Sequence, residues 1–363
     1  MASQPFAGPL VQELPVRVMI VDDSAVARAV FRRMVGAHPS FDIVAECAGA
    51  PEALEALGTV RPDIILLDIE MPGGNGIDAL PELLVKSGGA RILVVSALAE
   101  EGAAETVRAL TLGAADTLAK PGRYVFSGGF GKQLTERLMR LARDDHGWAP
   151  QIDPVDLAVS PDAPSRSQWL AMPIACVGIG ASTGGLHAIS EFFCALPPEF
   201  DAPILITQHL PEIFMPFFAQ QLREMTGRNA QIACAGEWLE RGRLYVAPGD
   251  AHLCVEKFGK RARIRLDTGI SPTRCMPSVD PMFATMASAF GAHAVGIVLT
   301  GMGRDGSVGA QTLATAGAEI LAQSSETSVV WGMPGSVARA GLAAGVFAPD
   351  EIARHLGARN PAR

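Results

Sequence analysis

The stretch GIGASTGGLHA, residues 178–188, follows the apolar run IACV and surrounds Ser182 with glycine and alanine. An apolar strand that ends in a glycine-rich turn and continues into a helix is the repeating unit of α/β folds. Gly180 to Gly184 also fits G-x-S-x-G, in which a sharp turn between strand and helix exposes a serine hydroxyl. The stretch therefore predicts an α/β domain whose turn holds either a nucleophilic serine or a phosphate.

Two common phosphate-binding patterns do not fit this turn. The dinucleotide pattern G-x-G-x-x-G fails because Thr183 stands at the third glycine position after Gly178 and Gly180. The P-loop fails because no Gly-Lys-Ser/Thr follows. A nucleophilic serine therefore remains as the interpretation of this turn, but short motifs of glycine and serine also occur by chance. This interpretation therefore needs a base and an acid at the same edge of the sheet.

The chain from residue 173 to residue 357 continues the α/β pattern. Residues 202–209 (APILITQH) and 293–303 (HAVGIVLTGMG) are strand candidates, each followed by helix-compatible sequence. Residues 242–267 alternate polar and apolar side chains around the turns PGD and FGK, which predicts antiparallel hairpins. We expect residues 173–357 to form an α/β domain that carries such hairpins.

A base and an acid follow two of these strands. Parallel strands end at one edge of a sheet, which places His209 beside Ser182. Asp305 follows the strand at 293–303 and is suited to orient the imidazole and stabilise its charged form. Taken alone, His209 is equally well explained as a capping or surface residue, and Asp305 as part of an ordinary Asp-Gly turn. Taken together, the three groups favour a catalytic triad. Their chain order, Ser-His-Asp, disfavours an ordinary lipase or esterase.

The first half of the chain predicts another, mainly parallel sheet. Apolar, β-branched strand candidates alternate there with helix-compatible segments, as in βαβ units. The strand candidates are residues 16–23, 42–48, 62–72 and 91–98, and the helical ones include residues 24–37, 50–59 and 130–144. We expect residues 16–144 to form one domain.

Charged side chains follow the strands of this first domain. Asp22, Asp23 and Asp68 stand at strand ends, Ser96 ends another strand, and Lys120 precedes a proline. Carboxylates gathered at one rim need a cation, and ligation by oxygen alone suits Mg²⁺. A carboxylate beside Mg²⁺ can accept a phosphoryl group, whose charge a hydroxyl and an ammonium stabilise. Each Asp alone is better explained as a helix cap or turn former, but the ordered set favours a phosphorylation site.

Composition limits the remaining possibilities. A chain of 363 residues with 48% hydrophobic and 19% charged side chains is typical of two globular domains. The net charge of −8 argues against binding to nucleic acid or to an anionic membrane, and we expect no membrane insertion. The N-terminus lacks the pattern of a signal peptide, and six scattered cysteines suit a reducing cytoplasm.

A segment without periodicity separates the two predicted domains. Residues 145–172 are rich in Pro, Asp and Ser and predict a linker. Trp148, Leu157 and Trp169 are its apolar residues that we expect to dock on a domain surface.

The first domain resembles the receiver domain of two-component response regulators. The motifs that carry this resemblance are VDDS, LDIEMPGGNGID, VVSA and AKP, over residues 16–144. It implies a flavodoxin-like, doubly wound parallel sheet in which Asp68 is the phosphoacceptor and Asp22 and Asp23 help it to hold Mg²⁺. By the same resemblance Ser96 and Lys120 contact the phosphoryl group. The chain departs from the family at Thr117, where many receivers carry an aromatic residue, and in the glycine-rich loop PGGNG.

The second domain resembles the catalytic domain of chemotaxis protein-glutamate methylesterases, the CheB family. The matching motifs are GASTGG, QHLP, YVAPGDAHL, PSVDPMF, LTGMGRDG and AQ…TSVVWGMP. The resemblance implies a Rossmann-like α/β domain in which Ser182, His209 and Asp305 hydrolyse glutamate methyl esters on chemoreceptors, and also deamidate glutamines, without a cofactor. The backbone N–H groups of Thr183 and Met302 would hold the oxyanion. Cys275-Met276 replaces a basic pair that the family often has, which affects the expected docking of the receptor.

These resemblances imply a histidine kinase as phosphodonor, chemoreceptors as substrate and no nucleic-acid partner. We expect the receiver to cover the hydrolase rim until Asp68 is phosphorylated. A phospho-dependent scaffold with a degenerate hydrolase domain is the alternative of a different class, and a nucleotide-dependent oxidoreductase is the other enzymatic one. A DNA-binding regulator is disfavoured, because the second half shows no helix-turn-helix pattern and no basic face.

Overall fold

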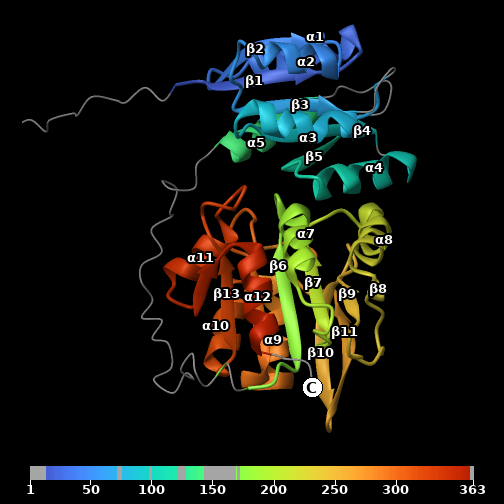
Figure 1. Cartoon of the computed structure of the whole chain (residues 1–363), viewed down its shortest axis with the longest axis vertical. Coiled ribbons are helices and arrows are strands. Elements are labelled where there is room, and N and C mark those ends of the chain that lie inside the picture. The colour runs from blue at the N-terminus through green and yellow to red at the C-terminus, as the bar shows by residue number, and fades with distance from the viewer. Residues whose placement is uncertain are drawn as a thin grey trace, which may run out of the picture.

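The computed structural model describes residues 14–71, 76–97, 100–120, 128–142, 169 and 172–359. Within these residues the chain forms two α/β units, each built on its own parallel sheet. Figure 1 shows the N-terminal unit, blue to green, stacked on the larger C-terminal unit, green to red.

The first unit is a five-stranded parallel sheet in the order β2-β1-β3-β4-β5. This is the strand order of flavodoxin-like, doubly wound folds, so the predicted fold class is confirmed. The elements are β1 (Val16–Val21), α1 (Ala25–Gly36), β2 (Phe41–Cys47), α2 (Ala50–Ala56), β3 (Ile64–Asp68), α3 (Gly76–Ser87), β4 (Arg91–Ala97), α4 (Glu100–Thr111), β5 (Asp116–Lys120) and α5 (Gly128–Ala142).

The apolar strands and amphipathic helices of this unit explain its architecture. All five residues of β3 are buried, as expected of a central strand covered on both faces. Phe31 of α1, Leu134 of α5 and Val18 of β1 belong to one buried cluster, while Leu80 of α3 belongs to the core on the other side of the sheet. Ser24 begins α1 by accepting a hydrogen bond from an N–H in its first turn.

The second unit is a seven-stranded parallel sheet in the order β14-β13-β12-β6-β7-β9-β8, with a separate antiparallel pair, β10-β11. Its strands are β6 (Cys176–Ala181), β7 (Ile204–Gln208), β8 (Ala230–Ile232), β9 (Leu244–Val246), β10 (His252–Phe258), β11 (Arg261–Asp267), β12 (Ala294–Val298), β13 (Glu319–Gln323) and β14 (Gly345–Phe347). Its helices are α7 (Gly185–Ala195), η1 (Glu212–Phe214), α8 (Met215–Thr226), α9 (Val279–Phe290), η2 (Gly291–His293), α10 (Ser307–Thr315), α11 (Met333–Arg339) and α12 (Pro349–Arg359).

The prediction of antiparallel hairpins across residues 242–267 is only half right. The FGK turn does close a hairpin, in which β10 pairs with β11. The segment before the PGD turn is β9, which pairs in parallel with β7 and β8 and lies within the large sheet. All three β9 residues are buried, because both neighbours and both faces are covered. A strand of three residues is too short to display the alternation that distinguishes a hairpin arm.

The two units contact each other through the α4–β5 side of the receiver-like unit. Figure 1 shows α4 lying across the end of the second unit that carries α7 and α8. The backbone N–H of Gly184 donates to the carbonyl of Ala115 at 2.8 Å, and His187 Nδ1 lies 3.0 Å from the carbonyl of Thr111. The turn after β6 is therefore bonded directly to the first unit.

The predicted linker, residues 145–172, lies outside the described residues except for Trp169 and Met172. Trp169 docks as expected, since its indole N–H donates to the carbonyl of Gly317 at 3.0 Å; Trp148 and Leu157 lie outside the described residues. Across the described part of the chain, no helix combines the length and apolar composition that crossing a bilayer requires.

Candidate active site and phosphorylation site

The carboxyl edge of the second sheet brings together the residues that the sequence predicts as a triad. Ser182 follows β6 and His209 follows β7, and the last residues of these strands, Ala181 and Gln208, are register partners. The His209 N–H donates to the Ala181 carbonyl at 3.1 Å. Asp305, in the loop after β12, accepts a 2.8 Å hydrogen bond from His209 Nε2. Three segments far apart in sequence thus meet at one edge.

The carboxylate of Asp305 is buried and held by several donors. Oδ1 accepts from Ser278 Oγ at 2.6 Å and from Thr273 Oγ1 at 2.8 Å, and Oδ2 accepts from the Val279 N–H at 2.7 Å. Burial raises the pKa of this carboxyl, but the hydrogen bonds and charge of His209 and the donors Ser278 and Val279 outweigh burial and leave its pKa below the usual value. Asp305 therefore stays charged beside the imidazole.

A buried histidine supports the segment that supplies these donors. His252 Nδ1 accepts from the Ser278 N–H at 2.9 Å, and its Nε2 lies 2.8 Å from the carbonyl of Gly269. A ring nitrogen that accepts carries no proton, so His252 is neutral and donates from Nε2. The sequence does not predict that His252, Ser278 and Thr273 belong to this site. A usable signal for Ser278 was its place as the N-cap of α9.

The turn that carries Ser182 takes its unusual backbone conformation at a glycine. Gly184 has φ +76°, and a side chain there would meet Val329. Among the described residues, Arg274 is the only non-glycine with positive φ, so Ser182 itself does not adopt the left-handed conformation. In the described part of the chain Ser182 Oγ makes no hydrogen bond to His209; such contacts are often long before substrate binds.

The predicted oxyanion donors lie around Ser182. A Cβ on Gly301 would lie 2.8 Å from Ser182 Cβ, so only glycine lets the loop carrying Met302 come this close. Within the described residues, the backbone N–H groups of Thr183 and Met302 have no hydrogen-bond acceptor. They are therefore available to a substrate oxygen.

Asp280 gives this site a pH-dependent stability. Burial, and the charge of Asp305, raise the pKa of Asp280 to about 6, against an unfolded value of 3.8. Because the folded state holds this proton more tightly, the free energy of unfolding falls as pH rises from about 4 to 6, by on the order of 2 kcal/mol. We predict that Asp280→Asn gains stability relative to wild type over this range.

Urea denaturation of both proteins at pH 4.5 and pH 7.5 measures this difference. Asp250→Asn, which alters an exposed carboxylate, is the control and should track wild type at both values. If the free energies of unfolding of Asp280→Asn and wild type differ by the same amount at both pH values, the pKa of Asp280 does not change on folding.

The acids of the first sheet also converge. Oxygen atoms of Asp22, Asp23 and Asp68 lie within 4.8 Å of one another. Lys120 Nζ lies 3.0 Å from Asp22 Oδ2 and also bonds Asp68. Burial raises the pKa of Asp68, although Lys120 acts in the opposite direction. Burial lowers the pKa of Lys120, but the carboxylates of Asp68 and Asp22 outweigh burial and leave its pKa above the usual value. Three carboxylates around one point are the ligand set that Mg²⁺ prefers, so the residues fit this ion.

Ser96 makes a contact that the sequence did not predict. Its hydroxyl lies 2.8 Å from Thr106 Oγ1 on α4, and Thr106 donates its own proton to the carbonyl of Gly102 at 2.7 Å. Ser96 is therefore the donor to Thr106. Thr117, in the position where many receivers carry an aromatic residue, is buried in β5. Of the loop PGGNG, residues 72–75 lie outside the described residues.

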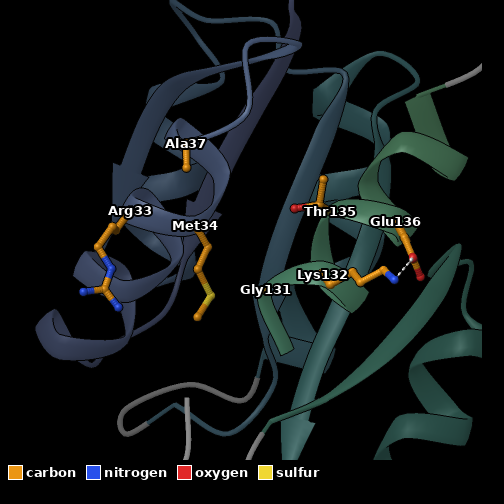
Figure 2. Close-up of a pocket in the computed structure, with 7 residues that line it drawn as sticks. All are labelled: Arg33, Met34, Ala37, Gly131, Lys132, Thr135 and Glu136. Atoms are coloured by element: carbon orange, nitrogen blue, oxygen red, sulfur yellow. Dashed lines mark ion pairs between the residues drawn. The ribbon is translucent and has the colours of Figure 1, made fainter. Parts of the chain in front are cut away.

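Two pockets of the described residues lie away from both sites. Figure 2 shows one of about 540 Å³ between α1 and α5, lined by Arg33, Met34, Ala37, Gly131, Lys132, Thr135 and Glu136. A second, of about 260 Å³, lies between α4 and α8 and is lined from both units, by Ala104, Glu105, Arg108, Phe217, Gln220, Gln221 and Glu224. A hollow thus lies between helices α4 and α8, at the contact between the two units.

Fold and site together define a receiver domain joined to an α/β domain of the serine-hydrolase type. Two family models match the chain, the response regulator receiver domain over residues 18–124 and the CheB methylesterase over residues 177–356. A protein-glutamate methylesterase/protein-glutamine glutaminase of Caulobacter vibrioides is 42% identical and covers 95% of this chain and 99% of its own length. One from Rhodopseudomonas palustris is 36% identical, covering 94% and 93%.

A solved structure of the catalytic domain of Thermotoga maritima CheB methylesterase is also similar. It is 33% identical and covers 50% of this chain and 97% of its own, with a TM-score of 0.49. On the sequence relationships, the chain belongs to the CheB family of protein-glutamate methylesterases/protein-glutamine glutaminases.

Proposed function

We propose that this protein is a phosphorylation-activated hydrolase that demethylates glutamate methyl esters, and deamidates glutamines, on the cytoplasmic domains of chemoreceptors. The observation that carries the proposal is the His209–Asp305 pair, which lies at the edge where Ser182 follows β6 and whose carboxylate accepts from three further donors. A protein that only binds its partners does not need a histidine that a carboxylate orients. We place the protein in the cytoplasm with its substrate.

The chemistry follows from the roles of these groups. Ser182 Oγ attacks the ester carbonyl, and its proton passes to His209 Nδ1, the ring nitrogen that Asp305 leaves free. Asp305 stabilises the imidazolium, while the N–H groups of Thr183 and Met302 hold the oxyanion. His209 returns the proton to the departing methoxide, which leaves as methanol. Water, deprotonated by His209, then cleaves the acyl-enzyme and regenerates Ser182; with a glutamine substrate ammonia leaves instead.

We propose that the receiver restrains this site by covering its rim. The Gly184 N–H, two residues from Ser182, is bonded to Ala115 of the receiver, and α4 packs on α7 and α8. A receptor helix cannot reach Ser182 while these contacts persist. The hollow between α4 and α8 supports an interface that can separate, as interfaces between domains commonly do.

Phosphorylation would act on the same surface through Asp68. A histidine kinase supplies the phosphoryl group, Asp22, Asp23 and Asp68 would hold Mg²⁺, and Lys120 pairs with the added charge. When bound, the ion neutralises phosphoryl charge during transfer. To reach the phosphoryl group, Ser96 must leave Thr106 and so removes a hydrogen bond from α4, the helix that contacts the hydrolase.

Released methanol tests the proposed function. We expect the protein to release methanol from receptor membranes carrying methylated glutamates, and to do so faster with a small phosphodonor and Mg²⁺. Unmethylated membranes are the control for background. A protein that binds these membranes in a phosphodonor-dependent way, yet releases no methanol, would be a scaffold.

A further inference from the structure

The active site contains a thiol that the proposed chemistry does not use. Ligand atoms of His209, Cys275 and Asp305 lie within 4.8 Å of one another, and the three residues come from the end of β7, the segment before α9 and the loop after β12. A thiol, an imidazole and a carboxylate that converge from separate elements form a cluster of three different metal-ligating groups.

The spacing of this cluster suits a small divalent ion. Zn²⁺ binds sulfur at about 2.3 Å and nitrogen or oxygen at about 2.0–2.2 Å, so ligands of a tetrahedral site lie about 3.3–3.7 Å apart. Closing from the observed separations takes movement of about 1 Å, within reach of a side-chain rotation. Cys275 can make it, because its Sγ has only a weak contact, 4.0 Å, with the carbonyl of Thr273.

The charges around the cluster favour a cation. Asp305 and Asp280 are both buried nearby, and after burial itself their charges are what raises the pKa of the Cys275 thiol. A bound dication reverses this effect, since it stabilises a thiolate beside the carboxylates. Sulfur and imidazole ligands select Zn²⁺ over Mg²⁺, which prefers the all-oxygen cluster of the receiver.

We propose that His209, Cys275 and Asp305 form an inhibitory site for a borderline-soft divalent cation of the Zn²⁺ class. An ion there occupies the His209–Asp305 pair, so the imidazole can no longer accept the proton of Ser182. The inhibition rests on the proposed function, whereas the binding does not. The oxygen cluster and the mixed cluster would then act in opposite directions, the first supporting activation and the second blocking hydrolysis.

Optical titration with Co²⁺ tests binding separately from activity. The full chain in excess Mg²⁺ should develop a thiolate-to-cobalt charge-transfer band that Zn²⁺ then removes. Cys275→Ser should lack the band, and Cys234→Ser, which alters an exposed cysteine, should keep it. No band in wild type, or the same band in Cys275→Ser, would overturn the site.

Inhibition is measured on the same proteins as methanol release. Zn²⁺ should inhibit wild type and Cys234→Ser alike, and Cys275→Ser should need at least about 10-fold more Zn²⁺, because loss of even an outer-shell partner costs about 10- to 100-fold in affinity. Each protein is compared with its own metal-free rate. A cysteine-dependent band in a fully active, zinc-loaded enzyme would overturn the inhibitory role. The same band in a chain that never hydrolyses ester would support the metal site and overturn the proposed function.

Discussion

Replacing Ser182 with alanine is expected to abolish methanol release from methylated receptors, with a loss of about 10⁴-fold or more. Without the hydroxyl no acyl-enzyme forms, and His209 and Asp305 have no nucleophile to activate. The rate is measured on the phosphorylated protein, in which the receiver does not limit access.

The matched control is Ser190→Ala, on α7, whose hydroxyl donates a hydrogen bond to Met225 Sδ, away from the catalytic site. It should retain hydrolysis. Both variants should accept phosphate on Asp68 at the wild-type rate, which shows that they are folded. Hydrolysis retained by Ser182→Ala would contradict the assignment of the nucleophile.

Asp68→Ala should make the enzyme insensitive to phosphodonor, so that the ratio of activated to basal rate falls to about 1. The variant loses the acceptor carboxylate, so no charge is added beside Lys120 and Ser96 keeps its bond to Thr106. The basal rate should change little, since the hydrolase site is untouched.

Asp63→Ala controls for the loss of a carboxylate from the same unit. Asp63 precedes β3 at the opposite end from Asp68 and bonds the backbone N–H of Arg17. We expect it to retain activation even if its stability falls. Equal activation of Asp68→Ala and wild type by phosphodonor would show that phosphorylation of Asp68 does not control hydrolysis.

The positions of the site residues were predictable because they depend on strand ends. A buried parallel strand is visible as an apolar run, and the residue after it must lie at the carboxyl edge of the sheet. This places Ser182 near His209 and Asp22 near Asp68 without knowledge of side-chain geometry. The same reasoning failed for β9, because a run of three buried residues does not reveal the direction of its pairing.

The groups that tune the sites were not predictable in this way. Ser278 and Thr273 reach Asp305 from a segment outside regular strands, whose path only the folded chain defines. Thr106 reaches Ser96 from the interior of a helix, where a threonine gives no sequence signal of its own. In the sequence Cys275 stands out only as a departure from the family pattern, and the folded chain brings it beside His209.

The most direct test of the hydrolase assignment is covalent labelling of the intact protein with a fluorophosphonate, followed by peptide mass spectrometry. A serine activated by an imidazole–carboxylate pair reacts with this probe, whereas an ordinary surface serine does not. We predict one added phosphonate, on Ser182, at a rate that rises with phosphodonor, and no labelling in His209→Ala. Absence of label on Ser182, with and without phosphodonor, would contradict it and favour the scaffold.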